Sequence, residues 1–165
     1  MVFEAYDPRK AYRQHVGVLW DADGDGKREY CLTISHKGDT IYIPMYISEE
    51  VKTENLPNLP FMEMELSLGS TTYLPHDVGA TTRKMESEII VHIYFTDRDN
   101  IDRTVFAKLI KDKFQYLTRT NQCLVPQMDF MNVEEDGLEE ESDGRRIVFH
   151  YVAVLYCLYY DICIE

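Results

Sequence analysis

The chain has 165 residues, of which 45% are hydrophobic and 28% charged, and its formal net charge is −12. This composition can bury a core, which excludes a chain that is disordered throughout, and the length suits a single domain over 1–165. The negative charge argues against general affinity for the phosphate backbone of DNA or RNA, because such affinity requires a cationic surface.

Residues 1–56 are expected to form a β-rich N-terminal extension of that domain. Short apolar runs separated by turn residues predict an antiparallel meander of three strands, at 15–20, 30–35 and 41–47. Pro44 lies in the third run and has no backbone N–H to donate, which predicts an edge strand or a bulge there. A helix at 8–14 is signalled only weakly, and the first residues show no signal-peptide or lipidation pattern.

An acidic segment joins the first two expected strands. Asp21, Asp23, Asp25 and Glu29 stand at positions 1, 3, 5 and 9 of a loop with glycine at position 6, a spacing that directs oxygen ligands toward a calcium ion. An EF-hand is excluded because position 12 is Leu32 rather than glutamate. The pattern is similar to short calcium loops in the β-hairpins of propeller-type proteins, but an ordinary Asp-Gly hairpin turn is the favoured explanation. Calcium binding would make the chain a calcium-binding adaptor or interaction module, which stays as an alternative function.

Residues 57–165 are expected to form the α+β core. The strands predicted from alternating apolar residues are 61–68, 85–95, 127–134 and 146–163. A polar loop is expected at 69–82, and an amphipathic helix at about 100–117, with Asp99 placed to cap it. The predicted fold class is therefore α+β, with a mostly antiparallel sheet, one main amphipathic helix packed on one face and the N-terminal hairpin meander.

The last expected strand is apolar on both faces. Its run from 147 to 160 is interrupted only by His150 and is shorter than the about 20 residues of a membrane-spanning helix, so no membrane contact is expected. A strand with two apolar faces requires cover on both of them. The helix can cover one face, and either the N-terminal meander or a neighbouring subunit would have to cover the other.

An acidic stretch precedes that strand and is expected to be a solvated loop between two strands, flexible through charge repulsion. Its acids are Glu134, Glu135, Asp136, Glu139, Glu140, Glu141 and Asp143. Arg145 and Arg146 follow directly, and they would pair with these acids either across a subunit boundary or within the chain at its surface.

The sequence shows no pattern for catalysis. It lacks the serine nucleophile elbow, the phosphate-binding glycine loop and the dinucleotide glycine motif. Paired carboxylates occur on two expected strands, as Glu63 with Glu65 and Glu86 with Glu88. Alternating glutamates are typical of the solvent side of a strand, so we predict that the chain is not an enzyme, with a metal-dependent hydrolase as the less favoured alternative. His92 and His150 both lie in expected strands and are candidate neighbours.

The cysteines do not indicate a metal or redox site. The chain has 4 of them, Cys31, Cys123, Cys157 and Cys163, without a C-x-x-C pattern and without histidine at zinc-ligand spacing. We therefore expect reduced thiols and assembly inside a cell.

From residue 57 onward the expected elements follow a particular order. A proline-led strand at 59–66 precedes a polar loop and a long strand that ends in an aromatic residue, at 88–95. An amphipathic helix entered through an Asp/Asn-rich turn follows, and an acidic excursion leads to a final strand that closes on Tyr159-Tyr160-Asp161. This order, which covers about two-thirds of the chain, resembles the tail-terminator (tail-completion) and neck proteins of long-tailed viruses.

The resemblance implies a structural virion protein of the tail or neck, assembled in the host cytoplasm. Such proteins form a homo-oligomeric ring, commonly a hexamer, that ends tail-tube polymerisation at the head-proximal end and joins the tail to the neck. The implied partners are further copies of the chain, the tail-tube protein and a neck or head-completion protein, and no cofactor is implied. DNA would only pass through the negative lumen. The resemblance also implies that the acidic loop at 134–143 and the polar loop at 69–82 carry the contacts with other subunits or with the tube. Members of the family usually open with a helix.

Overall fold

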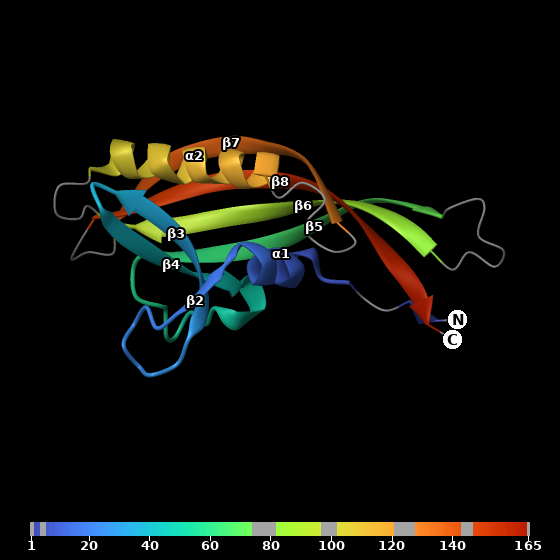
Figure 1. Ribbon diagram of the computed structural model, residues 1–165, viewed down its shortest axis with the longest axis horizontal. Helices are drawn as coiled ribbons and strands as arrows, with labels where there is room; N and C mark the ends of the chain where they lie inside the picture. Colours follow the sequence, from blue (N-terminus) through green and yellow to red (C-terminus); the bar gives the residue numbers. More distant parts are fainter. Residues whose placement is uncertain are drawn as a thin grey trace.

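The computed structural model describes residues 2–3, 6–73, 82–96, 102–120, 128–142 and 147–164. Within these ranges the chain forms one eight-stranded sheet, two α-helices and a short 3₁₀ helix (Figure 1). In chain order the elements are β1 (Val2–Phe3), α1 (Pro8–Val16), β2 (Val18–Trp20), β3 (Glu29–His36), β4 (Asp39–Ile47), η1 (Ser48–Glu50), β5 (Phe61–Tyr73), β6 (Thr82–Phe95), α2 (Arg103–Thr120), β7 (Met128–Ser142) and β8 (Ile147–Ile164).

The sheet has the strand order β1-β8-β6-β5-β4-β3-β2, and β7 pairs with β8 beside this path. Neighbouring strands are antiparallel except β4 and β5, which pair in parallel over Met45–Ile47 and Met62–Met64. The expected α+β class with a mostly antiparallel sheet is thereby confirmed. The N-terminal meander β2-β3-β4 also forms, but it extends the sheet and does not cover the second face of β8, so that alternative is wrong.

Burial alternates along the two central strands. On β6 every second residue from Met85 to Phe95 is buried, and on β8 every second residue from Phe149 to Asp161 is buried, whereas the residues between them are half-buried. The registers of β5, β6 and β8 place these buried residues on one side, which we call the core face, whereas the buried Phe61 of β5 pairs with Tyr94 on the other side. The opposite side is the outer face.

Both helices pack on the core face. Phe106 of α2 stacks on Phe95 of β6 with ring centroids 4.3 Å apart, and Tyr12 of α1 belongs to the same hydrophobic core. Tyr6, just before α1, packs its ring against Tyr159 of β8 at 5.5 Å. α2 contacts β7 and β3, near opposite ends of the strand order, and α1 contacts β3, β4 and β5 (Figure 1). One core therefore joins the N-terminal extension to the rest of the chain.

Helix α1 replaces the start of the first expected strand. Asp7 caps it, because its side chain accepts a hydrogen bond from the Arg9 backbone N–H, and Pro8 occupies the first turn. The helix ends at Gly17, where a Cβ atom would lie 2.6 Å from the Arg13 carbonyl oxygen and 2.9 Å from Cβ of Tyr30. Only Val18–Trp20 of the expected 15–20 strand therefore pairs in the sheet.

The expected acidic loop is instead part of a strand. β7 runs to Ser142 and pairs with β8 along its length, with register shifts between Phe130 and Asn132 and between Glu135 and Gly137. Gly137 has a φ of 142°, a conformation that favours glycine at such a bulge. The open edge of β8 offers backbone partners that the charge pattern could not reveal. The acids whose side chains are described on β7 remain exposed to water, where they need no partner.

The other boundaries shift in the same direction, toward longer strands. β5 extends to Tyr73 and β6 begins at Thr82, so much of the expected 69–82 loop is paired, and 74–81 lie outside the described residues. The α2 N-terminus is capped by Asp102, whose carboxylate accepts a 2.9 Å hydrogen bond from the Val105 N–H. Asp99, the expected cap, lies outside the described residues.

The two chain ends meet at one end of the sheet (Figure 1). β1 pairs with the last residues of β8, Val2 opposite Ile164. Beside this pair, the buried Asp161 carboxylate accepts hydrogen bonds from the Arg83 guanidinium at 2.8 Å and from the Tyr6 backbone N–H at 3.3 Å. This polar cluster fixes the segment before α1 to the end of β8. Among the described residues, no helix is both long and apolar enough to cross a bilayer.

Candidate functional site

The outer face of β6 and β8 is largely apolar. Its half-buried side chains are Ile90, His92 and Tyr94 on β6, and Val148, His150, Val152, Val154, Tyr156, Leu158 and Tyr160 on β8. Ile90 pairs with Val154 and His92 with Val152, so these side chains form adjacent rows. Both described α-helices pack on the core face, and neither covers these rows. The outer face thus exposes apolar area at the centre of the sheet.

A row of rings crosses the outer face from β4 to β8. Tyr46 meets Phe61 edge to face at 6.4 Å between ring centroids, and Phe61 stacks with Tyr94 at 5.1 Å. Tyr94 stacks in turn with His150 at 4.4 Å. Phe61 is itself 4% exposed, so the row presents the half-buried rings of Tyr46, Tyr94 and His150. Tyrosine rings offer amphipathic surface at a low cost in conformational entropy and are common at protein interfaces.

The row ends at His92 and His150, which were candidate neighbours because both lie in expected strands. His92 Nδ1 lies 2.8 Å from His150 Nε2, a distance that requires one nitrogen to donate and the other to accept. His92 Nε2 lies 3.4 Å from a carboxylate oxygen of Glu65. These contacts hold the two rings in position on the outer face.

Acidic side chains flank the apolar rows on both sides. The outer face carries Glu63 and Glu65 on β5, Glu86 and Glu88 on β6, and Glu134 and Glu139 on β7. Glu86 accepts a hydrogen bond from Ser70 Oγ at 3.1 Å and lies 3.6 Å from Lys84 Nζ. The expected carboxylate pairs are thus neighbours along strands that face solvent, and they border an apolar surface.

The acidic strand β7 is joined to α2 by one ion pair. Arg103 of α2 lies 2.8 Å from Glu140 and places its guanidinium 5.5 Å from the ring centre of Phe149. Of the expected interface acids, Glu135, Asp136 and Glu141 also lie on β7. Asp143, Arg145 and Arg146 lie outside the described residues, so their expected ion pairs stay predictions.

The acidic loop between β2 and β3 is held together by its own carboxylates. Asp21 accepts hydrogen bonds from the backbone N–H groups of Gly24 at 2.9 Å and Gly26 at 3.0 Å. Asp23 and Asp25 each accept one from the residue two positions on, at 3.2 Å and 2.7 Å. Gly24 and Gly26 have φ values of 75° and 86°, which glycine adopts without strain. The loop therefore forms a turn from these bonds alone.

The same loop brings three of the four candidate cation ligands together. Asp21, Asp23 and Asp25 each offer a carboxylate oxygen within 4.8 Å of the others, the one such group of His, Cys, Asp or Glu side chains among the described residues. Glu29 does not join them, because its carboxylate accepts a hydrogen bond from the Tyr46 hydroxyl at 3.2 Å. Burial raises the pKa of Glu29, the Tyr46 hydrogen bond opposes that rise, and the negative aspartates add to it. Three carboxylates suit a hard cation, which takes further oxygens from water or backbone.

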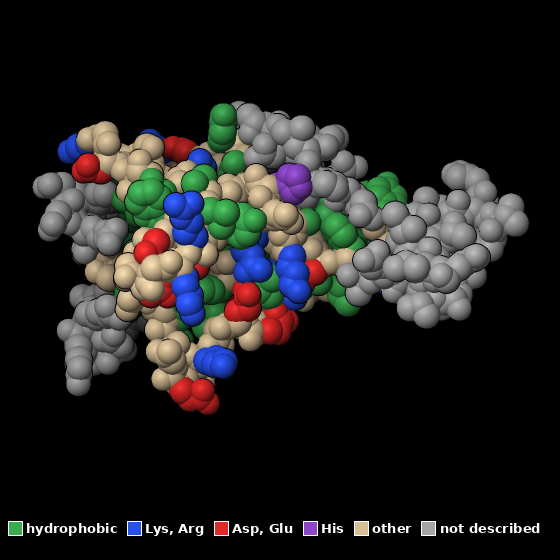
Figure 2. All heavy atoms as spheres, turned by 60° about the horizontal axis from the view of Figure 1, so that its bottom comes forward, with side chains coloured by type: hydrophobic (Ala, Val, Ile, Leu, Met, Phe, Trp, Pro, Cys, Tyr) green, Lys and Arg blue, Asp and Glu red, His purple; other side chains and the backbone are tan. Residues whose placement is uncertain are grey.

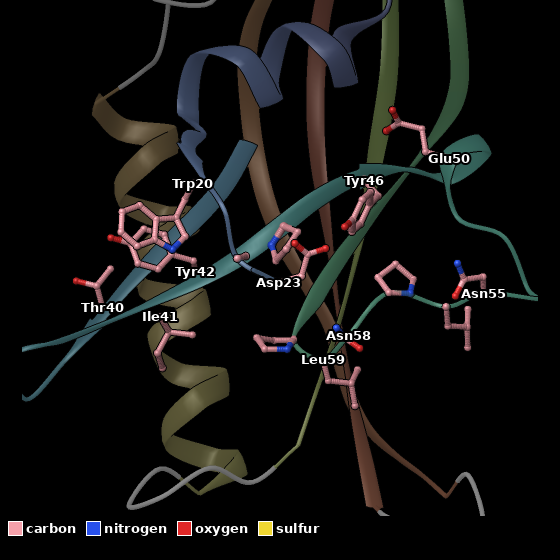
Figure 3. Close-up of a pocket in the computed structure, with 15 residues that line it drawn as sticks. Trp20, Asp23, Thr40, Ile41, Tyr42, Tyr46, Glu50, Asn55, Asn58 and Leu59 are labelled. Atoms are coloured by element: carbon pink, nitrogen blue, oxygen red, sulfur yellow. The ribbon is translucent and has the colours of Figure 1, made fainter. Parts of the chain in front are cut away.

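A cleft of about 450 Å³ lies beside this loop (Figure 3). Trp20 stacks on Tyr42 at one end of the cleft, with centroids 4.4 Å apart, and its side chain is 47% exposed. Asn55 lies at the other end, and Asp23 and Tyr46 lie between them. The sequence did not reveal this cleft, because its walls come from separate parts of the chain: the end of β2 with the turn after it, strand β4 and the turn at 55–60. A tryptophan on a short strand and a proline-rich turn were its only signals.

Charge elsewhere on the molecule is mixed. Figure 2 shows Lys and Arg side chains interspersed with Asp, Glu and hydrophobic side chains on the face that comes forward there. This contrasts with the outer face, where Lys84 is the one lysine or arginine among the described side chains of β5 to β8 and glutamates border both sides. The outer face therefore combines apolar area with charge of one sign.

Comparison with known proteins adds no family to this picture. No family model matches the chain, and no curated protein matches it. The functional argument accordingly rests on the outer face and on the Asp21 to Asp25 loop with its cleft.

Proposed function

We propose that the chain is a structural virion subunit that acts by assembling with other protein chains through the outer face of its sheet. In this proposal it forms a ring at the head-proximal end of a viral tail tube, ends polymerisation of the tube and joins the tail to the neck. One observation carries the proposal: β8 is apolar on both faces, and both α-helices pack on the same one.

The energetics favour a covered outer face. Burying an apolar side chain of the size of valine or leucine contributes about 1.5–3 kcal/mol when burial is complete. Each half-buried side chain of the outer face has gained only part of this free energy, and a partner that covers the face would add the rest. Contiguous exposed apolar surface on a folded protein marks an interaction site. The row of rings from Tyr46 to His150 adds the residue types that are enriched in interfaces.

The order of elements supports the proposal that the subunit belongs to a ring at the end of a viral tail tube. The short strand β1 precedes α1, a helix near the start of the chain as tail terminators usually have. After β2 to β4, a long strand, an amphipathic helix and a tyrosine-rich final strand follow. The net charge of −12 would repel phosphate, which suits a ring through which DNA passes without adhering. Acidic residues of β7 border this face, where a neighbouring subunit or the tube would meet them.

Light scattering and negative-stain electron microscopy of the purified chain test this proposal. We expect an oligomer whose size depends on concentration, and its loss in Val154→Glu, which places a charge in the centre of the outer face. Leu68→Glu is the matched control, because Leu68 is 64% exposed and lies away from these rows. A folded Val154→Glu chain that assembles as well as the native chain would contradict the proposal.

A calcium-dependent interaction module is the second candidate. It is favoured by the position of the three aspartates beside a cleft with a half-exposed tryptophan. In that case titration calorimetry with calcium should release heat, and Asp21→Asn with Asp23→Asn should abolish it. No heat with the native chain, together with no change in unfolding temperature on chelation, would remove this candidate.

A further inference from the structure

We propose that the cleft lined by β4 and the two turns beside it binds the guanidinium group of an arginine side chain from a partner protein. This inference goes beyond the proposed function, because the cleft would bind such a group whether or not the chain forms a ring. It joins three features of the cleft, which are its aromatic rings, its negative charge and its size.

Aromatic rings from two strands line the cleft (Figure 3). Trp20 of β2 and Tyr42 of β4 stack with their ring planes 8° apart, so each ring covers one face of the other. Trp20 is nevertheless 47% exposed, which leaves indole surface open to a ligand. The registers of β2, β3 and β4 place Trp20, Tyr42 and Tyr46 on the same side of the sheet. Cations are attracted to the negative faces of such rings.

The charge of the cleft is negative. Among the described residues, its lining includes two acids, Asp23 and Glu50, and no lysine or arginine. Glu50 is paired with Arg13, whereas Asp23 has no ion-pair partner in the described parts of the chain. Burial raises the pKa of the Tyr46 hydroxyl, and the negative charges of Glu29 and Asp23 raise it further. This field favours a cationic ligand and opposes an anionic one.

The lining favours a guanidinium group over a metal ion. A guanidinium is planar and weakly hydrated, so it stacks on an aromatic face while its N–H groups bind a carboxylate. Asp23 lies between the Trp20 end of the cleft and Tyr46, so rings and a carboxylate border the same space (Figure 3). Leu56 and Pro57 add apolar lining, which the methylene groups of an arginine stem would cover and a metal ion would not.

The size and position of the cleft favour a side chain from a second protein. Its volume of about 450 Å³ lies within the range of ligand sites, about 300–1,000 Å³. Trp20 and Leu56 lie at the surface, at 47% and 61% exposure, so a partner's side chain has access. Tyr46 also begins the row of rings across the outer face, so the cleft adjoins the surface proposed for assembly. Arginine is enriched at protein interfaces.

Trp20 is the one tryptophan of the chain, so tryptophan fluorescence reports on the cleft directly. The full chain is titrated in EDTA with N-acetyl-arginine amide and with N-acetyl-citrulline amide, its neutral analogue. We expect a saturable change with the arginine compound, with a dissociation constant in the millimolar range, and binding of the citrulline compound at least about tenfold weaker. No saturable change with arginine, or equal binding of citrulline, would overturn the inference.

Asp23→Asn tests the carboxylate, because asparagine keeps an oxygen that can accept the hydrogen bond from the Asp25 N–H. It should weaken binding of the arginine compound about tenfold, whereas Asp23→Glu, which keeps the charge, should bind within about threefold of the native chain. Circular dichroism should show native folding in each variant.

Asp112→Asn is the matched control. Asp112 is also exposed, its substitution changes the net charge by the same amount, and it lies on α2, which packs on the core face away from the cleft. The control should bind the arginine compound as the native chain does. Equal losses in Asp112→Asn and Asp23→Asn would overturn the inference, since net charge alone would then explain them.

Two further ligands test the group and its source. N-acetyl-lysine amide should bind more weakly than the arginine compound, and equal binding would overturn the assignment to guanidinium. Free arginine should bind no more tightly than the blocked compound, and binding about tenfold tighter would overturn the assignment to a partner protein.

The outcomes also separate this inference from the proposed function, because the titrations are made at concentrations at which the chain is monomeric. A chain that assembles through its outer face but does not bind the arginine compound overturns the inference and leaves the proposed function standing. A chain that binds the compound with the expected selectivity but never assembles supports the inference and contradicts the proposed function.

Discussion

The two faces of β8 differ little in composition and strongly in burial. Phe149, Ala153 and Leu155 on the core face are buried under helices of the same chain, whereas Val152 and Val154 on the outer face remain half-buried. Apolar composition alone therefore does not distinguish a core from an interface. The difference lies in what covers each face, and only one of them is covered by described elements of this chain.

Thiol reactivity should give the largest difference between the faces. Burial raises the pKa of Cys157, on the core face, to about 12 from an ordinary value of 9.0, which lowers its thiolate fraction roughly a thousandfold. Leu158→Cys places a thiol one residue away, on the outer face. Under native conditions we expect the new thiol to react with iodoacetamide while Cys157 does not, measured by peptide mass mapping.

The same variant reports on assembly. When the chain associates, the thiol of Leu158→Cys should become protected, because a partner then covers the outer face. Equal labelling of this thiol in the monomer and in the assembled state would show that another surface is used. Cys31, whose pKa burial raises to about 11, serves as an internal reference that stays protected in both states.

Two neighbouring isoleucines on β6 allow the contributions of the two faces to the stability of the monomer to be compared. Ile89 is fully buried on the core face, and Ile90 is half-buried on the outer face. Ile89→Ala should lower the free energy of unfolding of the monomer by about 3–4 kcal/mol, because it leaves a cavity, and Ile90→Ala by about 1 kcal/mol. Urea denaturation at low protein concentration measures both, and similar losses would contradict a difference between the faces.

Ion pairs on the two faces should differ in their contribution to the free energy of unfolding, but by a smaller amount than the two isoleucines. Asp161 is 3% exposed and accepts charged hydrogen bonds from Arg83, whereas Glu86 lies 3.6 Å from Lys84 at the surface. Asp161→Ala should lower the free energy of unfolding by about 2–3 kcal/mol. Glu86→Ala should lower it by less than about 1 kcal/mol, since exposed pairs contribute little. Thermal unfolding in low and high salt tests this order, and an equal loss would contradict it.

Periodicity predicted the fold class because alternation along β5, β6 and β8 records which side chains meet the core. It also predicted the amphipathic helix and the neighbourhood of His92 and His150. Periodicity did not predict the full length of β7. The acidic side chains of this strand are solvated as in a loop, and the strand is held by hydrogen bonds to the backbone of β8, which leave no pattern in the sequence. The stretch 8–16 contains few apolar residues, so α1 was signalled only by Pro8 and its capping Asp7.

The candidate site was predictable only in part. The two apolar faces of β8 were visible in the sequence, but which face lacks cover depends on where α1 packs, and that is fixed by long-range contacts such as Tyr6 with Asp161. Three of four calcium-loop acids converge, and Glu29 departs because Tyr46, from another strand, binds it. The cleft depends on strand β4 and on two distant turns, and it gave no local pattern.

The pairing of Val2 with Ile164 has a consequence for folding of the chain. The two partners lie far apart in the sequence, and such contacts form slowly because a long loop has to close first. Because β8 also forms the centre of the outer face, a chain whose sheet is incomplete does not yet present the surface through which copies join. Oligomers should therefore form from fully folded subunits.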